Sequence, residues 1–110
     1  MLSGYDPTLL AWALSAFFVA GGLFNIIAPP MLAAEYAHWG YPSWFHYITG
    51  LCELSAAALM AFPPTRLPGG VLAMAVMAAA VITVLWHHQR THAIAPGIVF
   101  VLTGAMLSML

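Results

Sequence analysis

The sequence predicts an all-α integral membrane protein: a bundle of four helices with both chain termini on the same side of the membrane. Its composition is 64% hydrophobic and only 5% charged, whereas a soluble domain carries roughly 25% charged residues. Four long apolar segments follow one another, and prolines, which stop or open helices, stand at their ends. With 110 residues, we expect a single domain, 1–110.

The four predicted helices are 8–28, 43–62, 69–87 and 94–110, each bounded by prolines or a polar turn. A membrane-spanning helix needs roughly 20 apolar residues. The last segment is the shortest, because its 17 residues give about 25 Å of helix. The sequence leaves open whether this fourth helix fully spans.

Four crossings define two faces. Side A carries both termini and the loop 63–68, and side B carries the loops 29–42 and 88–93. We expect an interfacial turn of helix at 31–39, whose apolar side chains would lie on the lipid surface. The positive-inside rule compares the basic residues on the two sides of the membrane. Each side has one arginine, so the rule does not give the orientation of the chain. The segment 1–7 lacks the basic start of a secretory signal, so we expect the first helix to be retained.

Several classes of function are excluded. The net charge of -1 offers no basic surface to nucleic acid. The one cysteine, Cys52, allows no internal disulfide and no thiolate cluster, and we read it as a packing residue. The histidine-rich stretch 87–92 is read as an interfacial loop, and His46 with His87 lacks a third ligand for a haem or metal. We therefore predict no metal site and no bound cofactor.

Glu53 is the most informative residue, because a carboxylate in the middle of an apolar membrane helix is costly and usually functional. It lies about 15 Å from the start of its helix, near the bilayer midplane. Helical spacing puts small and polar residues on its face: His46, Thr49, Gly50, Glu53, Ala56, Ala57 and Met60. One side of this helix is therefore predicted to face the interior of the bundle.

The polar residues of the neighbouring helices fall near side B, which predicts a cleft that opens toward side B with Glu53 at its floor. Its predicted walls are Asn25, His46, Thr49, Thr83 and His87. Aromatic residues form a belt at the same face, and from it we assign Tyr41 and Trp44 to the mouth of the cleft. The alternative is that Glu53 is a protonated packing residue, bonded to a backbone carbonyl or to Asn25.

Three blocks of sequence carry a resemblance to a known family. They are AGGLFN (20–25), GYPSWFHYITGLCEL (40–54) and MAAAVIT (77–83). In order and spacing the chain resembles the DoxX-like family of small four-helix membrane proteins. The resemblance implies a compact bundle with Glu53 as the characteristic intramembrane acid, but no single reaction. It implies that relatives include accessory membrane subunits of quinone-linked sulfur oxidation and proteins of stress responses.

Two departures from the family pattern bear on the chemistry. The family usually has a lysine where this chain has Asn25, so a cationic partner for Glu53 would be missing. Relatives often place a histidine where this chain has Val84, and His87 lies one turn further on. Without a cation nearby, we expect Glu53 to be neutral at rest and able to donate a proton.

Two classes of function remain open. In the first, a small lipophilic molecule such as a quinone or isoprenoid binds in the cleft, and Glu53 with His46 carries acid–base chemistry if the protein is an enzyme. The expected ligand-binding residues are Asn25, Thr49, Gly50, Tyr41, Trp44, Thr83 and His87. In the second, the chain is a non-catalytic accessory subunit that docks a membrane protein or a second copy of itself. A transporter is a weaker third option, and the expected location is a bacterial inner membrane.

Overall fold

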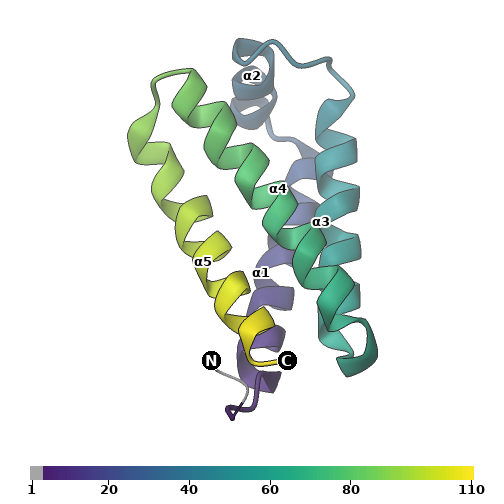
Figure 1. Cartoon of the computed structure of the whole chain (residues 1–110). Helices are drawn as coiled ribbons and strands as arrows, with labels where there is room; N and C mark the ends of the chain where they lie inside the picture. Colours follow the sequence, from purple (N-terminus) through teal and green to yellow (C-terminus); the bar gives the residue numbers. More distant parts are fainter. Residues whose placement is uncertain (1–3) are drawn as a thin grey trace.

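The computed structural model describes residues 4–110 and, within them, is all-α with no strand (Figure 1). Its α-helices are α1 (Thr8–Ile27), α2 (Pro30–His38), α3 (Phe45–Ala61), α4 (Arg66–Trp86) and α5 (Ile94–Ser108). Two short 3-10 helices precede α4 and α5, namely η1 (Pro63–Thr65) and η2 (Arg90–Ala93). The first three residues of the segment 1–7, for which no secretory signal was expected, lie outside the described part.

The described chain has five α-helices instead of the predicted four. The additional helix is the nine-residue α2, which forms where only an interfacial turn was expected. Proline at its first position lacks the N–H that the helix start leaves unpaired, so Pro30 favours this start. The four longer helices lie within three residues of their predicted bounds. The crossing of a membrane by all four stays a prediction.

Three of the helical stretches are long and apolar enough to cross a membrane: Thr8–Ile27, Pro63–Trp86 and Arg90–Ser108. The helix α3 has 17 residues, or about 26 Å, which is slightly less than the hydrocarbon core of roughly 30 Å. The helix predicted to be shortest, at the C-terminal end, gains length because η2 precedes α5 directly. The helix that carries Glu53, α3, is therefore shorter than the 19-residue helical stretch Arg90–Ser108.

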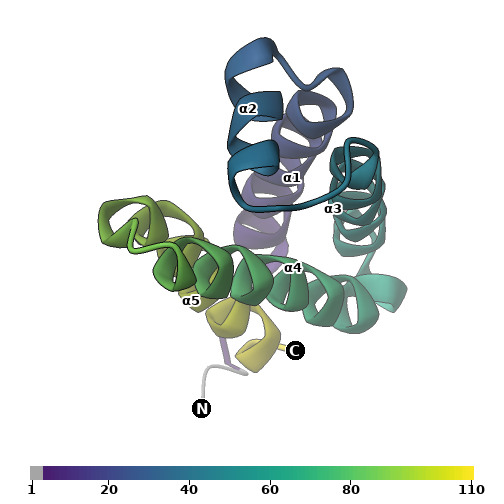
Figure 2. The ribbon, with the colours of Figure 1, turned by 90° about the horizontal axis from the view of Figure 1, so that it is seen from above.

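The helix α3 lies between α1 and α4 and packs against both, and α5 covers the other side of α4. Viewed from above, α1, α2 and α3 form one group and α4 and α5 another (Figure 2). The start of α1 and the end of α5 lie at the same end of the molecule (Figure 1). We call this the closed end, and the opposite end, where α2 lies, the roofed end.

The apolar core fills the half of the bundle near the closed end. It is formed by Ala11, Leu14, Phe18, Ala56, Ala57, Met60, Ala73, Met77, Val99 and Met106. These residues come from the first half and middle of α1 and α4, the later part of α3, and the middle and end of α5. The other half of the bundle contributes little to this core, and it is there that the cleft forms.

The closed end is fastened by contacts between α3, α4 and α1. Arg66 is buried, and its Nε donates a hydrogen bond to the carbonyl of Met60 at 3.0 Å. Trp12 Nε1 donates to the carbonyl of Ala61 at 3.1 Å. Both bonds satisfy carbonyls at the C-terminal end of α3 that have no partner within the helix. They fix the point from which α3 and α4 diverge.

Candidate functional site

A cavity of about 450 Å³ lies between α3 and α4, beneath α2. Its lining is mostly apolar, with a few polar groups at its inner side. The residues that line it are Asn25, Leu32, Tyr36, Trp39, Tyr41, Phe45, Ile48, Thr49, Cys52, Glu53, Leu72, Ala75, Val76, Met77, Ala79, Ala80, Thr83 and Val84. A mainly apolar cavity of this size with a few converging polar groups is typical of small-molecule sites.

The cavity has an inner side, lined by buried side chains, and an outer side, lined by exposed ones. Thr49 and Glu53 lie on the inner side, and Glu53 is only 4% exposed. Ile48, one residue before Thr49, also lines the cavity and is 44% exposed. On α4 the outer side is formed by the exposed alanines Ala75 and Ala79. The cavity therefore opens sideways between α3 and α4.

The carboxyl of Glu53 lies against α1. Asn25 Nδ2 donates a hydrogen bond to Glu53 Oε1 at 2.8 Å and another to the carbonyl of Gly21 at 2.9 Å. The missing side chain of Gly21 makes room for the acid, because a Cβ added there would overlap Glu53 Oε2. Asn25 is the only hydrogen-bond partner of Glu53 within residues 4–110. The acid thus has a neutral partner and no cationic one.

Asn25 joins three further elements to this acid. Its Oδ1 accepts a hydrogen bond from the hydroxyl of Tyr36 in α2, and its backbone carbonyl lies 2.8 Å from His46 Nδ1 in α3. Burial raises the pKa of the Tyr36 hydroxyl above its ordinary value of 10.0. Tyr36 therefore stays protonated near neutral pH and remains a donor to Asn25. The network fixes the amide so that its NH2 group points at Glu53.

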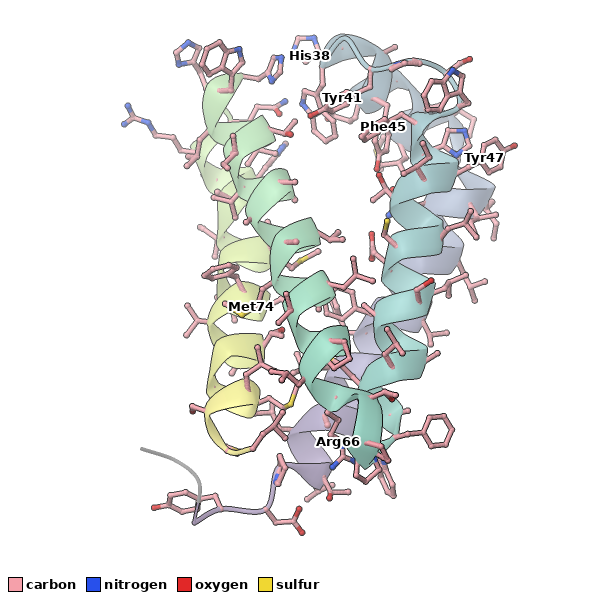
Figure 3. All side chains as sticks on the ribbon, turned by 45° about the vertical axis from the view of Figure 1, so that its right-hand side comes forward. His38, Tyr41, Phe45, Tyr47, Arg66 and Met74 are labelled. Atoms are coloured by element: carbon pink, nitrogen blue, oxygen red, sulfur yellow. The ribbon has the colours of Figure 1, made fainter. Side chains whose placement is uncertain are left out.

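The helix α2 and the residues that follow it cover the roofed end of the cavity. Trp39 Nε1 donates to Gln89 Oε1 at 2.8 Å, and the hydroxyls of Tyr41 and Thr83 are 2.7 Å apart. Tyr41 also stacks on Phe45, with ring centroids 4.4 Å apart, and both rings lie at the roofed end of the space between α3 and α4 (Figure 3). At the end where the cleft was predicted to open, α2 and the half-buried side chains after it therefore border the cavity. An opening toward side B stays a prediction.

The structure brings together five of the predicted site residues. Those that line the cavity are Asn25, Tyr41, Thr49, Glu53 and Thr83. The contribution of each to binding stays a prediction.

The other four lie elsewhere. His46 reaches the backbone of Asn25 from outside the lining, and Gly50 packs against Ile26 and the carbonyl of Gly22 in α1. Trp44 is 55% exposed, next to the start of α3. His87 Nδ1 lies 2.8 Å from the carbonyl of Thr83, at the end of its own helix.

Three residues matter more than the sequence indicated. Tyr36, which was not among the predicted site residues, bonds to Asn25, and Gly21, also not among them, accommodates the acid. Cys52 was read as a packing residue too, yet it is a partly exposed free thiol that lines the cavity. The available signal was its spacing from Ile48, four residues earlier, which puts both side chains on the strip of α3 next to the face of Glu53.

The fold and the site define a class: a membrane protein, with three helical stretches long and apolar enough to cross a bilayer, that contains a mostly apolar cleft with a few polar groups. The chain belongs to the DoxX-like family, whose family model matches residues 9–106. It is also similar to an uncharacterized protein, YdgD, of Bacillus subtilis (strain 168), with 33% identity over 48 residues. That match spans 44% of this chain and 42% of the relative. No solved structure matches the chain significantly.

Proposed function

We propose that this DoxX-like protein binds a small lipophilic molecule, such as a quinone or isoprenoid, in the cleft between α3 and α4. In this proposal α1, α3, α4 and α5 cross a bacterial inner membrane, with both termini on one side. The observation that carries the proposal is Glu53, an acid 4% exposed at the inner side of an apolar cavity of about 450 Å³. Intramembrane carboxyl groups mark sites or pathways by default.

The sideways opening supports a ligand that arrives from the bilayer. Ile48, Ala75 and Ala79 line the outer side and are exposed on the surface that faces lipid. At the roofed end, the Trp39–Gln89 and Tyr41–Thr83 hydrogen bonds join α2 and its following segment to the C-terminal end of α4 and the residues after it. A molecule already dissolved in the membrane meets the open side first. Its polar end then reaches Glu53, and its apolar part stays near the lipid.

Glu53 is the proposed proton donor of the site. A buried carboxyl whose only bonded partner is a neutral amide is held in its neutral form, since the charged form would be neither solvated nor paired. Such a group can protonate a ligand or donate a hydrogen bond to it. Asn25 orients the carboxyl, and His46 and Tyr36 position Asn25 through their own bonds.

Mass spectrometry of the protein in nanodiscs with native lipids tests the proposal. We expect the wild type to retain a specific small lipophilic molecule and Glu53→Gln, which keeps the shape of the side chain, to lose it. A circular-dichroism melt that matches the wild type shows that the variant is folded. The matched control is Glu35→Gln, which removes an acid of α2 that does not line the cavity.

Cys52 gives an independent readout, because it is the chain's one cysteine and lines the cavity. The retained molecule should slow the alkylation of Cys52 by a maleimide in the wild type but not in Glu53→Gln. A protein that retains no small molecule and instead carries a stoichiometric membrane-protein partner would contradict the proposal. It would favour the accessory-subunit alternative.

A further inference from the structure

We propose that the cleft selects a lipophilic amine, a ligand with one basic nitrogen on an apolar body. This inference rests on the proposed function and names the ligand class of the same site. Three features of the cleft carry it: the Asn25 and Tyr36 donors next to the acid are already used, the acid has no cation beside it, and aromatic rings border the cavity.

The hydrogen-bond inventory favours a ligand that donates. Both hydrogens of Asn25 Nδ2 are used, one on Gly21 and one on Glu53, and the Tyr36 hydroxyl donates to Asn25. Farther out, Trp39 Nε1 donates to Gln89. Glu53 Oε2, in contrast, accepts no hydrogen bond from the described residues. A ligand that only accepts finds the proton of Glu53 itself and, farther from the acid, one hydroxyl hydrogen of the Tyr41–Thr83 pair and the weak donor of the Cys52 thiol. An N–H instead finds a carboxyl oxygen of Glu53 that accepts no other bond within residues 4–110.

The charge distribution favours a cation at this oxygen. The chain has two lysine and arginine residues in total: Arg66, buried on the Met60 carbonyl at the closed end, and Arg90 in η2, beyond the roofed end of α4. The other ionisable groups around the acid are Tyr36 from α2, Tyr41 before α3, and Cys52 and His46 on α3, while α1 and α4 present none to the cavity. Of these groups only His46 can become a cation, and its Nδ1 faces the Asn25 carbonyl.

Aromatic rings form the wall of the cavity toward the roofed end. The ring centroid of Tyr36 lies 6.1 Å from that of Tyr41 and 6.2 Å from that of Phe45. The ring centroid of Trp39 lies 5.5 Å from that of Tyr36. All four aromatic residues, Tyr36, Trp39, Tyr41 and Phe45, line the cavity. Ring faces attract ammonium groups, and more strongly where water is excluded. A nitrogen held by Glu53 would thus meet the acid on one side and these rings on another.

The proton balance of binding is simple. The amine crosses the bilayer in its neutral form, and its nitrogen lone pair takes the proton of Glu53. The O–H bond of the acid breaks and an N–H bond forms, which leaves a carboxylate paired with an ammonium. No net charge enters the membrane, so the cost of moving a lone ion into a low dielectric does not arise. Because amines in neutral water are mostly protonated, each binding event releases a proton to the buffer.

Three probes with comparable apolar chains test the selectivity: dimethyldodecylamine, dodecanol and decylubiquinone. Protection of Cys52 from alkylation reports occupancy, and protein-free nanodiscs correct for partition of each probe into lipid. We expect the amine to bind on the order of 100-fold more tightly than dodecanol, the scale of a desolvated charge pair. Glu53→Gln should remove this preference and the proton release, while Glu35→Gln retains both.

The outcomes separate the inference from the proposed function. If decylubiquinone or dodecanol protects Cys52 as well as the amine does, the inference is overturned and the proposed function stands. If no probe protects Cys52 and no lipophilic molecule is retained from native lipids, both fail. If Glu53→Gln does not fold, the ranking of the three probes and the proton release, both measured on the wild type, still test the preference for an amine.

Discussion

Gly21 and Glu53 are in direct contact across the interface of α1 and α3, where the space of a missing side chain holds the carboxyl group. One turn before Glu53 along α3, the same interface is also close-packed, because a Cβ added at Gly50 would lie 2.6 Å from the Ile26 side chain and 2.8 Å from the carbonyl oxygen of Gly22. The two sites differ in what would have to move. At Gly21 it is the end of a flexible side chain, and at Gly50 it is backbone.

Gly21→Ala is therefore expected to move the acid without unfolding the protein. The added methyl displaces Glu53 Oε2, and the better helix propensity of alanine offsets part of the strain. We expect the free energy of unfolding to change by less than about 1 kcal/mol. Retention of the bound molecule should nevertheless fall, as measured by mass spectrometry of the purified protein. Unchanged retention would show that the position of the carboxyl does not matter.

Two glycine variants calibrate this result. Gly50→Ala forces α1 and α3 apart and should destabilise by about 1–3 kcal/mol, the usual cost of overpacking. Gly97→Ala, in open space on α5, should be neutral or stabilise by up to about 1 kcal/mol. Unfolding in mixed micelles followed by circular dichroism measures both. Equal stability of the two would contradict the close packing of α1 on α3.

Tyr36→Phe should loosen α2 from the bundle. The substitution keeps the ring but leaves Asn25 Oδ1 without its donor, which costs about 1–2 kcal/mol. The folded-state pKa of Tyr36 is raised by burial above the ordinary 10.0, so its contribution to stability is full below pH 10.0 and is lost as pH rises through the folded pKa. Tyrosinate absorbance should show a late ionisation in the wild type that is missing from Tyr36→Phe. Tyr47→Phe, at a residue 51% exposed, should leave the late ionisation in place.

Arg66→Met should weaken the closed end of the bundle. The variant keeps much of the side-chain length but removes the charged donor to the Met60 carbonyl. Hydrogen bonds to charged groups contribute about 1.5–3 kcal/mol, so a loss of that size in the free energy of unfolding is expected. Arg90→Met, at an exposed position, should change it by less than about 0.5 kcal/mol. Comparable losses in the two variants would rule out a specific role for Arg66.

Helix periodicity is the reason that part of the site could be predicted. The spacing along α3 placed Gly50, Glu53, Ala56, Ala57 and Met60 on one face, and all five are buried. The same reasoning placed Asn25 near the acid, because residues at corresponding depths of neighbouring helices meet. These predictions depend only on the geometry of regular helices, which the apolar pattern determines.

Residues at the ends of helices were harder to predict. Trp44 and His87 lie at the expected depth, but Trp44 is exposed and His87 bonds to its own helix. Depth along the helix does not determine the direction of a side chain once the regular turn ends. The docking of α2 and the segment after it depends on side-chain bonds to other elements: Tyr36 to Asn25, Trp39 to Gln89 and Tyr41 to Thr83. A single sequence contains no signal for such pairs.

The sideways opening of the cleft has a consequence for the size of molecule that a chain of 110 residues can recognise. A cavity of about 450 Å³ needs to enclose only a head group when the remainder of the molecule stays dissolved among the acyl chains. Recognition then becomes independent of tail length, because the bilayer solvates each further methylene equally in the bound and free forms. Molecules that share a head group but differ widely in total length would be equivalent to this protein.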